Sequence, residues 1–193
     1  MLNFFTRFFN PKEIVIKKGS LQRIKFIECQ NPILIYSNSS EQNGTLEKIQ
    51  TMIPQIELLK IKPGEPKASY IDHYIKEDFK NDVIIAVGGG SVLDTAKLII
   101  ANFLSDQDIY DIKPFTISDK YNKKPKFVAI PTTVGSGSES DGVAVSEHNK
   151  QKLPIVSDFL VPDLVILDPL LIQELPRDLL FKTALDAFSH GFE

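Results

Sequence analysis

The chain has 193 residues, of which 42% are hydrophobic and 24% charged, and its formal net charge is −3. These values are typical of a globular protein with one large core, or of one domain plus part of a second. A near-neutral balance without a basic stripe argues against nucleic acid as a partner. The single cysteine, Cys29, rules out an internal disulfide and fits a reducing cytoplasm. No apolar run approaches the roughly 20 residues that span a bilayer, so no membrane association is expected.

The first third of the chain alternates predicted strands with predicted helices. Residues 13–18 predict a strand, which is followed by a Gly19-Ser20 turn and a short helix through Phe26. Further along we expect a strand at 33–36, a helix at 41–53, a strand at 56–62 and a helix at 67–80. Asn38 lies in a run of small polar residues directly after the second strand. This is the carboxyl end of a strand, where ligands contact open α/β sheets.

The stretch Val83 to Lys97 carries the first motif that indicates chemistry. An apolar strand at 83–87 meets three glycines, Ser91 and an amphipathic helix at about 91–104. Glycine lets a ligand approach the main chain, and we expect Ser91 to cap the helix, whose free N–H groups can bind a phosphate. The turn differs from the G-x-G-x-x-G fingerprint, and a tight strand–helix turn without a ligand is the alternative.

The second half of the chain continues the alternation of strands and helices. Residues 105–126 read as a long surface connection. The strands expected after it lie at 127–131, from 143, at 153–157 and at 164–167, and a helix is expected at 176–193 with Pro176 at its start. The alternation predicts a doubly wound, mostly parallel sheet. The composition shifts near Pro176, and the last helix reaches Glu193 without a stop signal, so we expect a chain that is cut short.

Two further groups of residues can hold ligands. The loop that begins at Pro131 carries Thr132, Thr133 and Ser136 among glycines, and these hydroxyls can donate to a phosphate, a ribose or a carboxamide, or can satisfy their own backbone. Asp186 and His190 are four residues apart on the last predicted helix, so they share one face and can grip one divalent ion such as Fe²⁺ or Zn²⁺. An exposed Asp–His pair without a metal is the alternative, and neither His73 nor His148 offers a convincing third ligand.

In this order and at these separations the motifs resemble the iron-containing (group III) alcohol dehydrogenase family. The matching text is IIAVGGGSVLDTAK, FVAIPTTVGSGSES, VILDPLLIQELP and TALDAFSHGFE, and the resemblance covers essentially the whole chain. It implies an N-terminal dinucleotide-binding α/β domain at 1–175 and the first helix of a C-terminal helical metal-binding domain at 176–193. It also implies that the remaining family ligands, two histidines, lie beyond the end of this sequence.

The resemblance assigns roles residue by residue. Gly89, Gly90 and Ser91 would bind the pyrophosphate of NAD or NADP, and Asp94 would lie at the floor of the nicotinamide and substrate cleft as the catalytic-site residue. The remaining cofactor contacts would be Thr132, Thr133, Ser136, Val145 and Lys152. Asp186 and His190 would be the first two metal ligands, with Fe²⁺ favoured and Zn²⁺ left open.

Three positions depart from the family pattern. Asn38 stands where NAD-preferring members carry an aspartate, and its neutral side chain does not repel a 2′-phosphate, so the coenzyme preference stays open. Glu65 replaces the usual asparagine. Asp141 replaces the usual threonine and would put a negative charge near the cofactor loop.

The implied reaction is hydride transfer between NAD(P) and a small primary alcohol or aldehyde in a cytoplasmic oxidoreductase, and the resemblance leaves a homodimer open. One alternative is a catalytically incompetent remnant that binds nucleotide or serves oligomerisation. A lesser one is a glycerol dehydrogenase or a dehydroquinate synthase-like member of the same superfamily. Ser91 in place of a lysine after the glycines, together with the Asp186–His190 spacing, favours the alcohol dehydrogenase branch.

Overall fold

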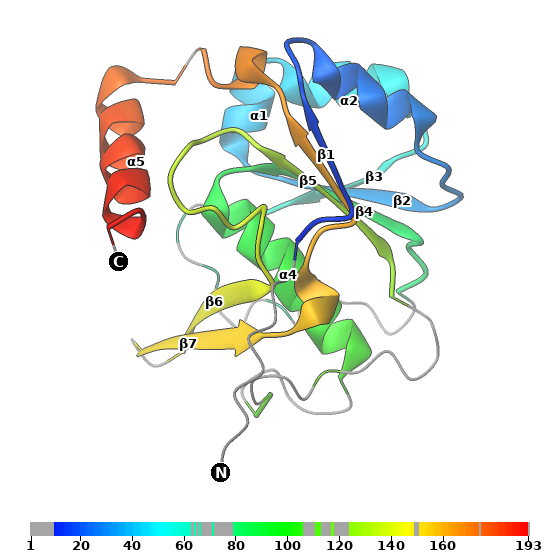
Figure 1. Ribbon diagram of the computed structural model, residues 1–193. Coiled ribbons are helices and arrows are strands. Elements are labelled where there is room, and N and C mark those ends of the chain that lie inside the picture. Colours follow the sequence, from blue (N-terminus) through cyan, green and yellow to red (C-terminus); the bar gives the residue numbers. More distant parts are fainter. Residues whose placement is uncertain are drawn as a thin grey trace.

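The structure is a computed structural model that describes residues 10–62, 64, 66, 71, 79–105, 111–112, 117, 124–148, 151–173 and 175–192 (Figure 1). Its strands are β1 (Glu13–Ile16), β2 (Pro32–Tyr36), β3 (Glu57–Lys60), β4 (Val83–Gly88), β5 (Lys126–Pro131), β6 (Val143–His148), β7 (Gln151–Val156) and β8 (Leu164–Leu167). Its α-helices are α1 (Asn38–Gln42), α2 (Thr45–Met52), α4 (Gly90–Leu104) and α5 (Arg177–His190), and its 3-10 helices are η1 (Ser20–Phe26), η2 (Asp158–Leu160) and η3 (Pro169–Leu171). Among these described residues, no helix is both long enough and apolar enough to cross a membrane.

Six strands form one parallel sheet in the order β1-β8-β5-β4-β2-β3. The central strand β4 pairs with β2 on one side and with β5 on the other, and all six of its residues are buried. This burial explains why its sequence is a continuous apolar run instead of an alternating one. The remaining two strands, β6 and β7, form a separate antiparallel hairpin. The predicted α/β class with a mostly parallel sheet is confirmed.

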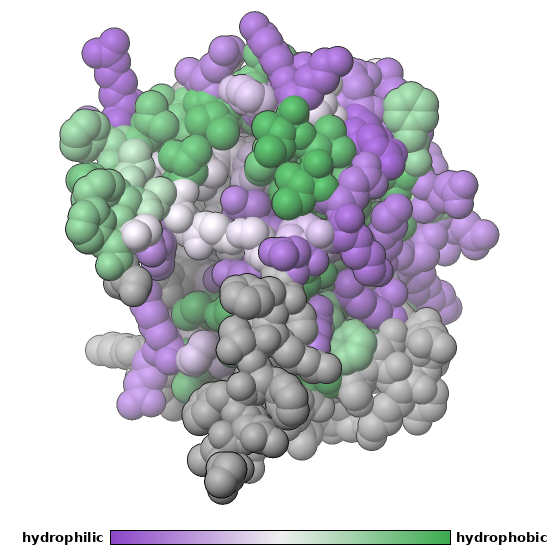
Figure 2. Space-filling model, in the orientation of Figure 1, coloured by the Kyte–Doolittle hydropathy of each residue, from purple (hydrophilic) through white to green (hydrophobic). Residues whose placement is uncertain are grey.

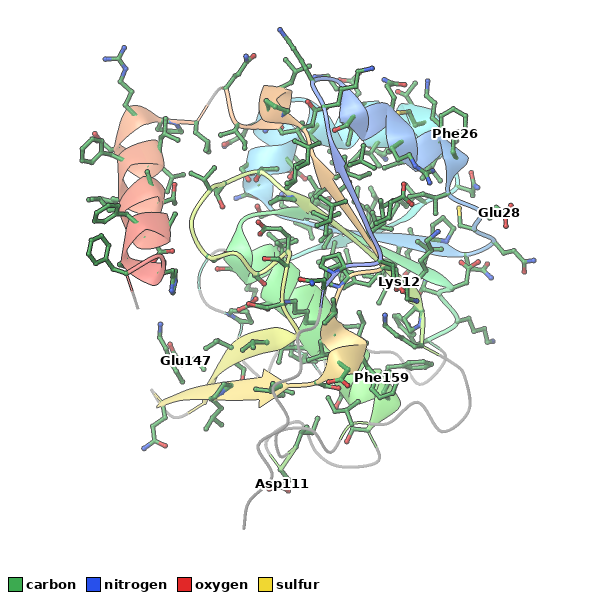
Figure 3. All side chains as sticks on the ribbon, in the orientation of Figure 1. Lys12, Phe26, Glu28, Asp111, Glu147 and Phe159 are labelled. Carbon is green, nitrogen blue, oxygen red and sulfur yellow. The ribbon has the colours of Figure 1, made fainter. Side chains whose placement is uncertain are left out.

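Apolar layers cover both faces of the sheet. On one face, side chains of β2, β4 and β5 pack against α4, with the β6–β7 hairpin and Phe159 of η2 beyond it (Figures 1 and 3). On the other face, the alternate side chains of the same strands pack against η1 and α2. Phe26, at the end of η1, is 75% exposed and points away from this core (Figure 3). The sheet is therefore doubly wound, with helices on each side.

The order of the strands fixes where a ligand can approach the sheet. From β2 the chain moves outward to β3, returns to β4 on the other side of β2, and then continues to β5. The direction of winding thus reverses between β2 and β4. In open α/β sheets such a reversal leaves a crevice at the carboxyl ends of the two strands, which is where ligands bind. In this chain the two ends carry Asn38, at the start of α1, and the glycines that follow β4.

Two local predictions are wrong. The helix expected at 41–53 is two helices, α1 and α2, because Gly44 between them adopts a left-handed φ of 70°. Ser91 does not cap α4: the capping position is Gly89, and Ser91 is the second residue of the helix. The helix starts earlier because Gly89 is extended and its carbonyl already accepts the N–H groups of Val92 and Leu93.

Other predicted features fall partly outside the described residues. Glu65 and His73 lie outside the described residues. So do most of the helix expected at 67–80 and most of the connection at 105–126. His148 is described as the last residue of β6, without its side chain. The remaining predicted strands are present with ends moved by one or a few residues.

Two carboxylates, one buried and one partly buried, hold the ends of β8. Asp168, which is 2% exposed, accepts the backbone N–H groups of Gly19, Leu21 and Leu170 and so ties the turn after β1 to the end of β8. Asp163 accepts the Phe127 N–H and forms ion pairs with two lysines, 12 and 124, at 2.6 and 2.9 Å. Burial alone would raise the pKa of Asp163, but these bonds dominate and hold it below its ordinary value.

The last helix, α5, differs from the rest of the fold. It stands apart from the sheet in Figure 1, and none of its residues is buried. Hydrophobic side chains gather over it in Figure 2, and they include Phe181 and Phe188, which are 71% and 64% exposed. The division of the chain at 175 and 176, predicted from the sequence, stays a prediction.

Candidate functional site

The glycine turn at the end of β4 is packed against the loop that follows β5. A Cβ on Gly89 would lie 3.0 Å from Thr133 Oγ1, and one on Gly90 would lie 2.8 Å from Ser136 Oγ. The two segments are also joined by a hydrogen bond from the Thr132 N–H to the Gly88 carbonyl at 3.0 Å. The close approach of the loop therefore leaves little room for a side chain at Gly89 and Gly90. The turn has no side-chain cap and no acidic residue in the first turn of α4, which favours an anion at the helix N-terminus.

The same loop reaches from the glycine turn to α5. Gly135 has a φ of 141°, which residues with a side chain rarely adopt, and a Cβ at this position would lie 2.6 Å from the Thr183 carbonyl oxygen. It would also lie 3.1 Å from Oδ2 of Asp186. The Thr/Ser/Gly composition of the loop is thus explained by two close contacts, one with each half of the site.

A pocket of about 520 Å³ opens between the glycine turn, this loop, the β6–β7 hairpin and α5. Of the residues singled out from the sequence, it is lined by Gly90, Ser91, Asp94, Thr133, Ser136, Val145, Lys152, Asp186 and His190. These residues are spread over 101 positions of the chain, from 90 to 190, and the fold brings them to one place. We refer to it as the central pocket.

Three of the predicted residues lie outside the lining of the central pocket. Gly89 is in contact with the side chain of Thr133, and Thr132 is 4% exposed. Both residues therefore support the turn from the side that faces away from the central pocket. Asn38 is exposed at the start of α1, at the end of the neighbouring strand β2. This position is consistent with a contact to a more distant part of an extended ligand.

Asp94 occupies the wall of the central pocket and is held by two hydrogen bonds. Its Oδ1 accepts from Ser138 Oγ at 2.6 Å and its Oδ2 from the Val145 N–H at 3.2 Å. Burial raises the pKa of Asp94, and the nearby Asp141 adds to this, while the Ser138 bond, Lys97 and the Val145 amide oppose it. The side chain is therefore a partly desolvated carboxyl in a pocket, a frequent property of functional groups.

Sequence reasoning missed Lys97, which is completely buried below Asp94 on α4. Its ammonium contacts Ser138, Asp141 and the Val143 carbonyl. The negative charge expected near the cofactor loop from Asp141 is thus paired with this lysine at 2.6 Å. Asp94 and Lys97 are the two charged residues of α4, and their spacing of three residues was the available signal.

Asp186 and His190 face the central pocket from α5 and form the candidate metal pair. Their Oδ1 and Nε2 atoms are 3.8 Å apart, and each side chain is about half exposed. Two ligands of a tetrahedral ion with bond lengths of about 2.0–2.2 Å lie about 3.3–3.6 Å apart, so a small side-chain rotation would bring this pair to that separation. Within the part of the chain that the structure describes, no group of three His, Cys, Asp or Glu residues gathers around them or elsewhere.

The model of the family described as iron-containing alcohol dehydrogenase matches residues 11–169. The chain belongs to this family. The resemblance predicted from the four motifs is therefore confirmed. The chain spans about half the length of the curated relatives it matches.

Three relatives illustrate the similarity. An alcohol dehydrogenase of Thermococcus barophilus is 31% identical, with 97% of this chain and 53% of that protein aligned. An NADPH-dependent butanol dehydrogenase of Clostridium saccharobutylicum is also 31% identical, over 97% of this chain and 51% of that protein. The crystal structure of NADH-dependent butanol dehydrogenase A from Thermotoga maritima superposes with a TM-score of 0.81 at 27% identity, covering 99% of this chain and 50% of that one.

Proposed function

We propose that the chain forms the nucleotide-binding part of a metal-dependent alcohol dehydrogenase or aldehyde reductase. The reaction is hydride transfer between NAD(P) and a small primary alcohol or aldehyde. The observation that carries this proposal is the central pocket, because a phosphate-type glycine turn and a carboxylate–imidazole pair face the same space. Residues 1–175 act as the dinucleotide domain, and 176–193 begin the helical metal-binding domain.

The residues of the chain have distinct tasks in this proposal. The backbone N–H groups at Gly90 and Ser91 hold the pyrophosphate, and the hydroxyls of Thr133 and Ser136 orient the nucleotide from the opposite side. Val145 and Lys152 extend this surface along the hairpin. Gly89 and Thr132 keep the turn in shape, since neither reaches the lining of the central pocket.

Asp94 and the metal pair act at the reacting end of the pocket. Asp94 lies beside the nicotinamide and the substrate. There it supplies a carboxyl group whose position is fixed by two hydrogen bonds. Asp186 and His190 would hold a divalent ion, Fe²⁺ or Zn²⁺. When bound, such an ion supplies Lewis-acid polarisation of a carbonyl oxygen, and the nicotinamide supplies the hydride.

The coenzyme and the surroundings of the enzyme are part of the proposal. Asn38, at the end of β2, is neutral and accepts a ribose with or without a 2′-phosphate, so both NAD and NADP are candidates. Of the two similar butanol dehydrogenases, one is named as NADPH-dependent and the other as NADH-dependent. A cytoplasmic location is supported by the single cysteine of the chain.

A fluorescence titration of the 193-residue chain with NADH and with NADPH tests the proposal. We expect binding of at least one of them, and loss of that binding in Ser91→Tyr, whose side chain would fill the turn. Thr51→Tyr, on the exposed face of α2, is the matched control and should bind like the parent. Equal affinity in Ser91→Tyr, or no binding of either nucleotide at millimolar concentration, contradicts the assignment.

A non-catalytic nucleotide-binding remnant is the second candidate, and one observation favours it. Among the described residues, no third His, Cys, Asp or Glu joins Asp186 and His190 in a group that could hold a metal ion. Turnover of alcohols or aldehydes by this chain with added Fe²⁺ or Zn²⁺ would reject the remnant, whereas nucleotide binding without turnover would support it. Comparison of butanol with glycerol as substrates separates the alcohol dehydrogenase branch from the glycerol dehydrogenase branch.

A further inference from the structure

Lys97 is a buried cation whose bonding capacity is fully used. Its side chain has no exposed surface, and its ammonium lies 3.1 Å from Ser138 Oγ, 2.6 Å from Asp141 Oδ1 and 2.8 Å from the Val143 carbonyl oxygen. An ammonium group has three N–H donors and no acceptor, so these three partners account for all of them. A charge in such a position persists only when it is paired and hydrogen-bonded.

These bonds fix the direction of the hydrogen bond that reaches Asp94. Because Lys97 can only donate, Ser138 Oγ is the acceptor of that contact. The single proton of the Ser138 hydroxyl is then left for Asp94 Oδ1, 2.6 Å away. The other carboxyl oxygen of Asp94 accepts a backbone N–H. Both oxygens therefore act as acceptors, which is the arrangement of an ionised carboxylate.

Asp141 completes the charge balance on the far side of the lysine. Its Oδ1 accepts from Lys97 and from the Val143 N–H, and its side chain is 46% exposed at the central pocket. The cluster of one lysine and two aspartates thus carries one net negative charge, and it is placed in the pocket. The other charged or titratable groups that line the pocket are Lys152, Asp186 and His190.

We propose that Lys97 is a positioning residue that acts through Ser138 to hold Asp94 as an oriented, ionised carboxylate. Asp141 is the partner that pairs with the buried lysine. The inference rests on the proposed function only in what Asp94 faces, namely the nicotinamide and the substrate. The hydrogen-bond network itself is a property of the chain without any ligand.

The titration of Asp94, followed by the ¹³C chemical shift of its carboxyl carbon in the ligand-free 193-residue chain, tests the network. In Lys97→Met, which keeps the length of the side chain, the midpoint should rise by about one pH unit or more, because a nearby opposite charge lowers a carboxyl pKa by about 1–3 units. Ser138→Ala should also raise the Asp94 midpoint, and it leaves Lys97 paired with Asp141. Lys48→Met, the same substitution at an exposed position of α2, is the matched control, in which the midpoint should not change.

An unchanged Asp94 midpoint in Lys97→Met, with native amide spectra, overturns the inference whatever Ser138→Ala shows. If Lys97→Met does not fold, Lys97→Gln takes its place, because it removes the charge and keeps a polar group that can donate to Ser138. A rise in Lys48→Met also overturns it, since that would indicate a general effect of net charge and not a specific link.

A second measurement connects the network to the nucleotide. The ratio of affinities for NAD⁺ over NADH should increase as the pH rises through the Asp94 midpoint, because an ionised carboxylate favours the positively charged oxidised ring. In Ser138→Ala this increase should move to higher pH together with the midpoint. A ratio that does not follow the midpoint overturns the link to the nicotinamide. If neither nucleotide binds, the proposed function fails, and the ligand-free titration still decides the role of Lys97.

Discussion

Substitution of Gly90 by alanine separates the role of the glycine turn in folding from its role in binding. The added Cβ would lie 2.8 Å from Ser136 Oγ and 3.1 Å from Ser136 Cβ, well inside the roughly 3.5–4.0 Å of ordinary carbon contacts. The hydroxyl can rotate away because Ser136 is exposed, but the Cβ atom cannot, so the loop must shift. Overpacking costs about 1–3 kcal/mol, and alanine in a helix recovers about 0.5–1 kcal/mol relative to glycine.

The two effects predict a small loss of stability and a large loss of binding. The free energy of unfolding should fall by about 0–2.5 kcal/mol, which corresponds to a decrease in Tm of up to about 10 °C for a chain of this size. The methyl group also occupies the approach of a phosphate to the N–H groups at the start of α4. Loss of one hydrogen bond to a charged group costs about 1.5–3 kcal/mol, so the affinity for NAD(P)H should fall by about 10-fold to more than 100-fold.

Thermal unfolding and fluorescence titration of four proteins provide the assay: the parent chain, Gly90→Ala, Ser136→Gly and the double variant. In the Ser136→Gly background the clash is removed, so Gly90→Ala should no longer lower the Tm. It should still lower the affinity for the nucleotide. Equal nucleotide affinity of Ser136→Gly and the double variant would refute the claim that the phosphate approaches the backbone here. A change in Tm on Gly90→Ala that is the same in the parent chain and in the Ser136→Gly background would refute the packing argument.

Four further outcomes follow from single contacts. Gly135→Ala should displace α5, because its φ is 141° and its Cβ would meet a backbone oxygen of that helix. Co²⁺ absorption should show weaker metal binding, and the Tm should fall by several degrees, because such strain costs about 1–3 kcal/mol. Asn38→Asp should lower the affinity for NADPH relative to NADH by tenfold or more in a fluorescence titration, and an unchanged ratio would place the ribose elsewhere. Asp168→Ala leaves three backbone donors without their acceptor and should reduce the free energy of unfolding in urea by about 3 kcal/mol or more. Asp163 has a lowered pKa in the folded chain. Its stabilising contribution is therefore present above the unfolded pKa of about 3.9 and is lost as the pH falls through the folded value. Asp163→Asn should flatten the dependence of the free energy of unfolding on pH below about pH 4.

The sheet could be predicted because its strands are buried on both faces. The continuous apolar runs of β4 and β5 have no polar face, and short runs of this kind between helical patterns are typical of parallel strands. The prediction failed where one residue interrupts a period. Leu46, Ile49 and Ile53 keep a helical spacing, yet Gly44 adopts a left-handed φ and separates the segment into two helices.

The site could be predicted in part, for the residues whose chemistry is visible in the sequence. Glycines and hydroxyls after a strand indicate a phosphate turn, and an aspartate four residues before a histidine indicates a metal pair. The beginning of α4 could not be placed, because any of three consecutive glycines accepts the extended capping conformation. Lys97 was missed because its partners Ser138 and Asp141 lie more than 40 positions away, and a lysine within a helix is usually solvated.

The two halves of the candidate site are held with different firmness. The glycine turn follows a strand whose residues are all buried, whereas α5 carries the metal pair and has no buried residue. The loop after β5 touches both, with Thr133 and Ser136 against the glycines and Gly135 against α5. Since Gly135 leaves no room for a side chain at that contact, a shift of α5 toward the sheet must move the loop, and the loop lies on the phosphate turn. The position of the candidate metal pair and the shape of the proposed nucleotide site are therefore linked through this one segment.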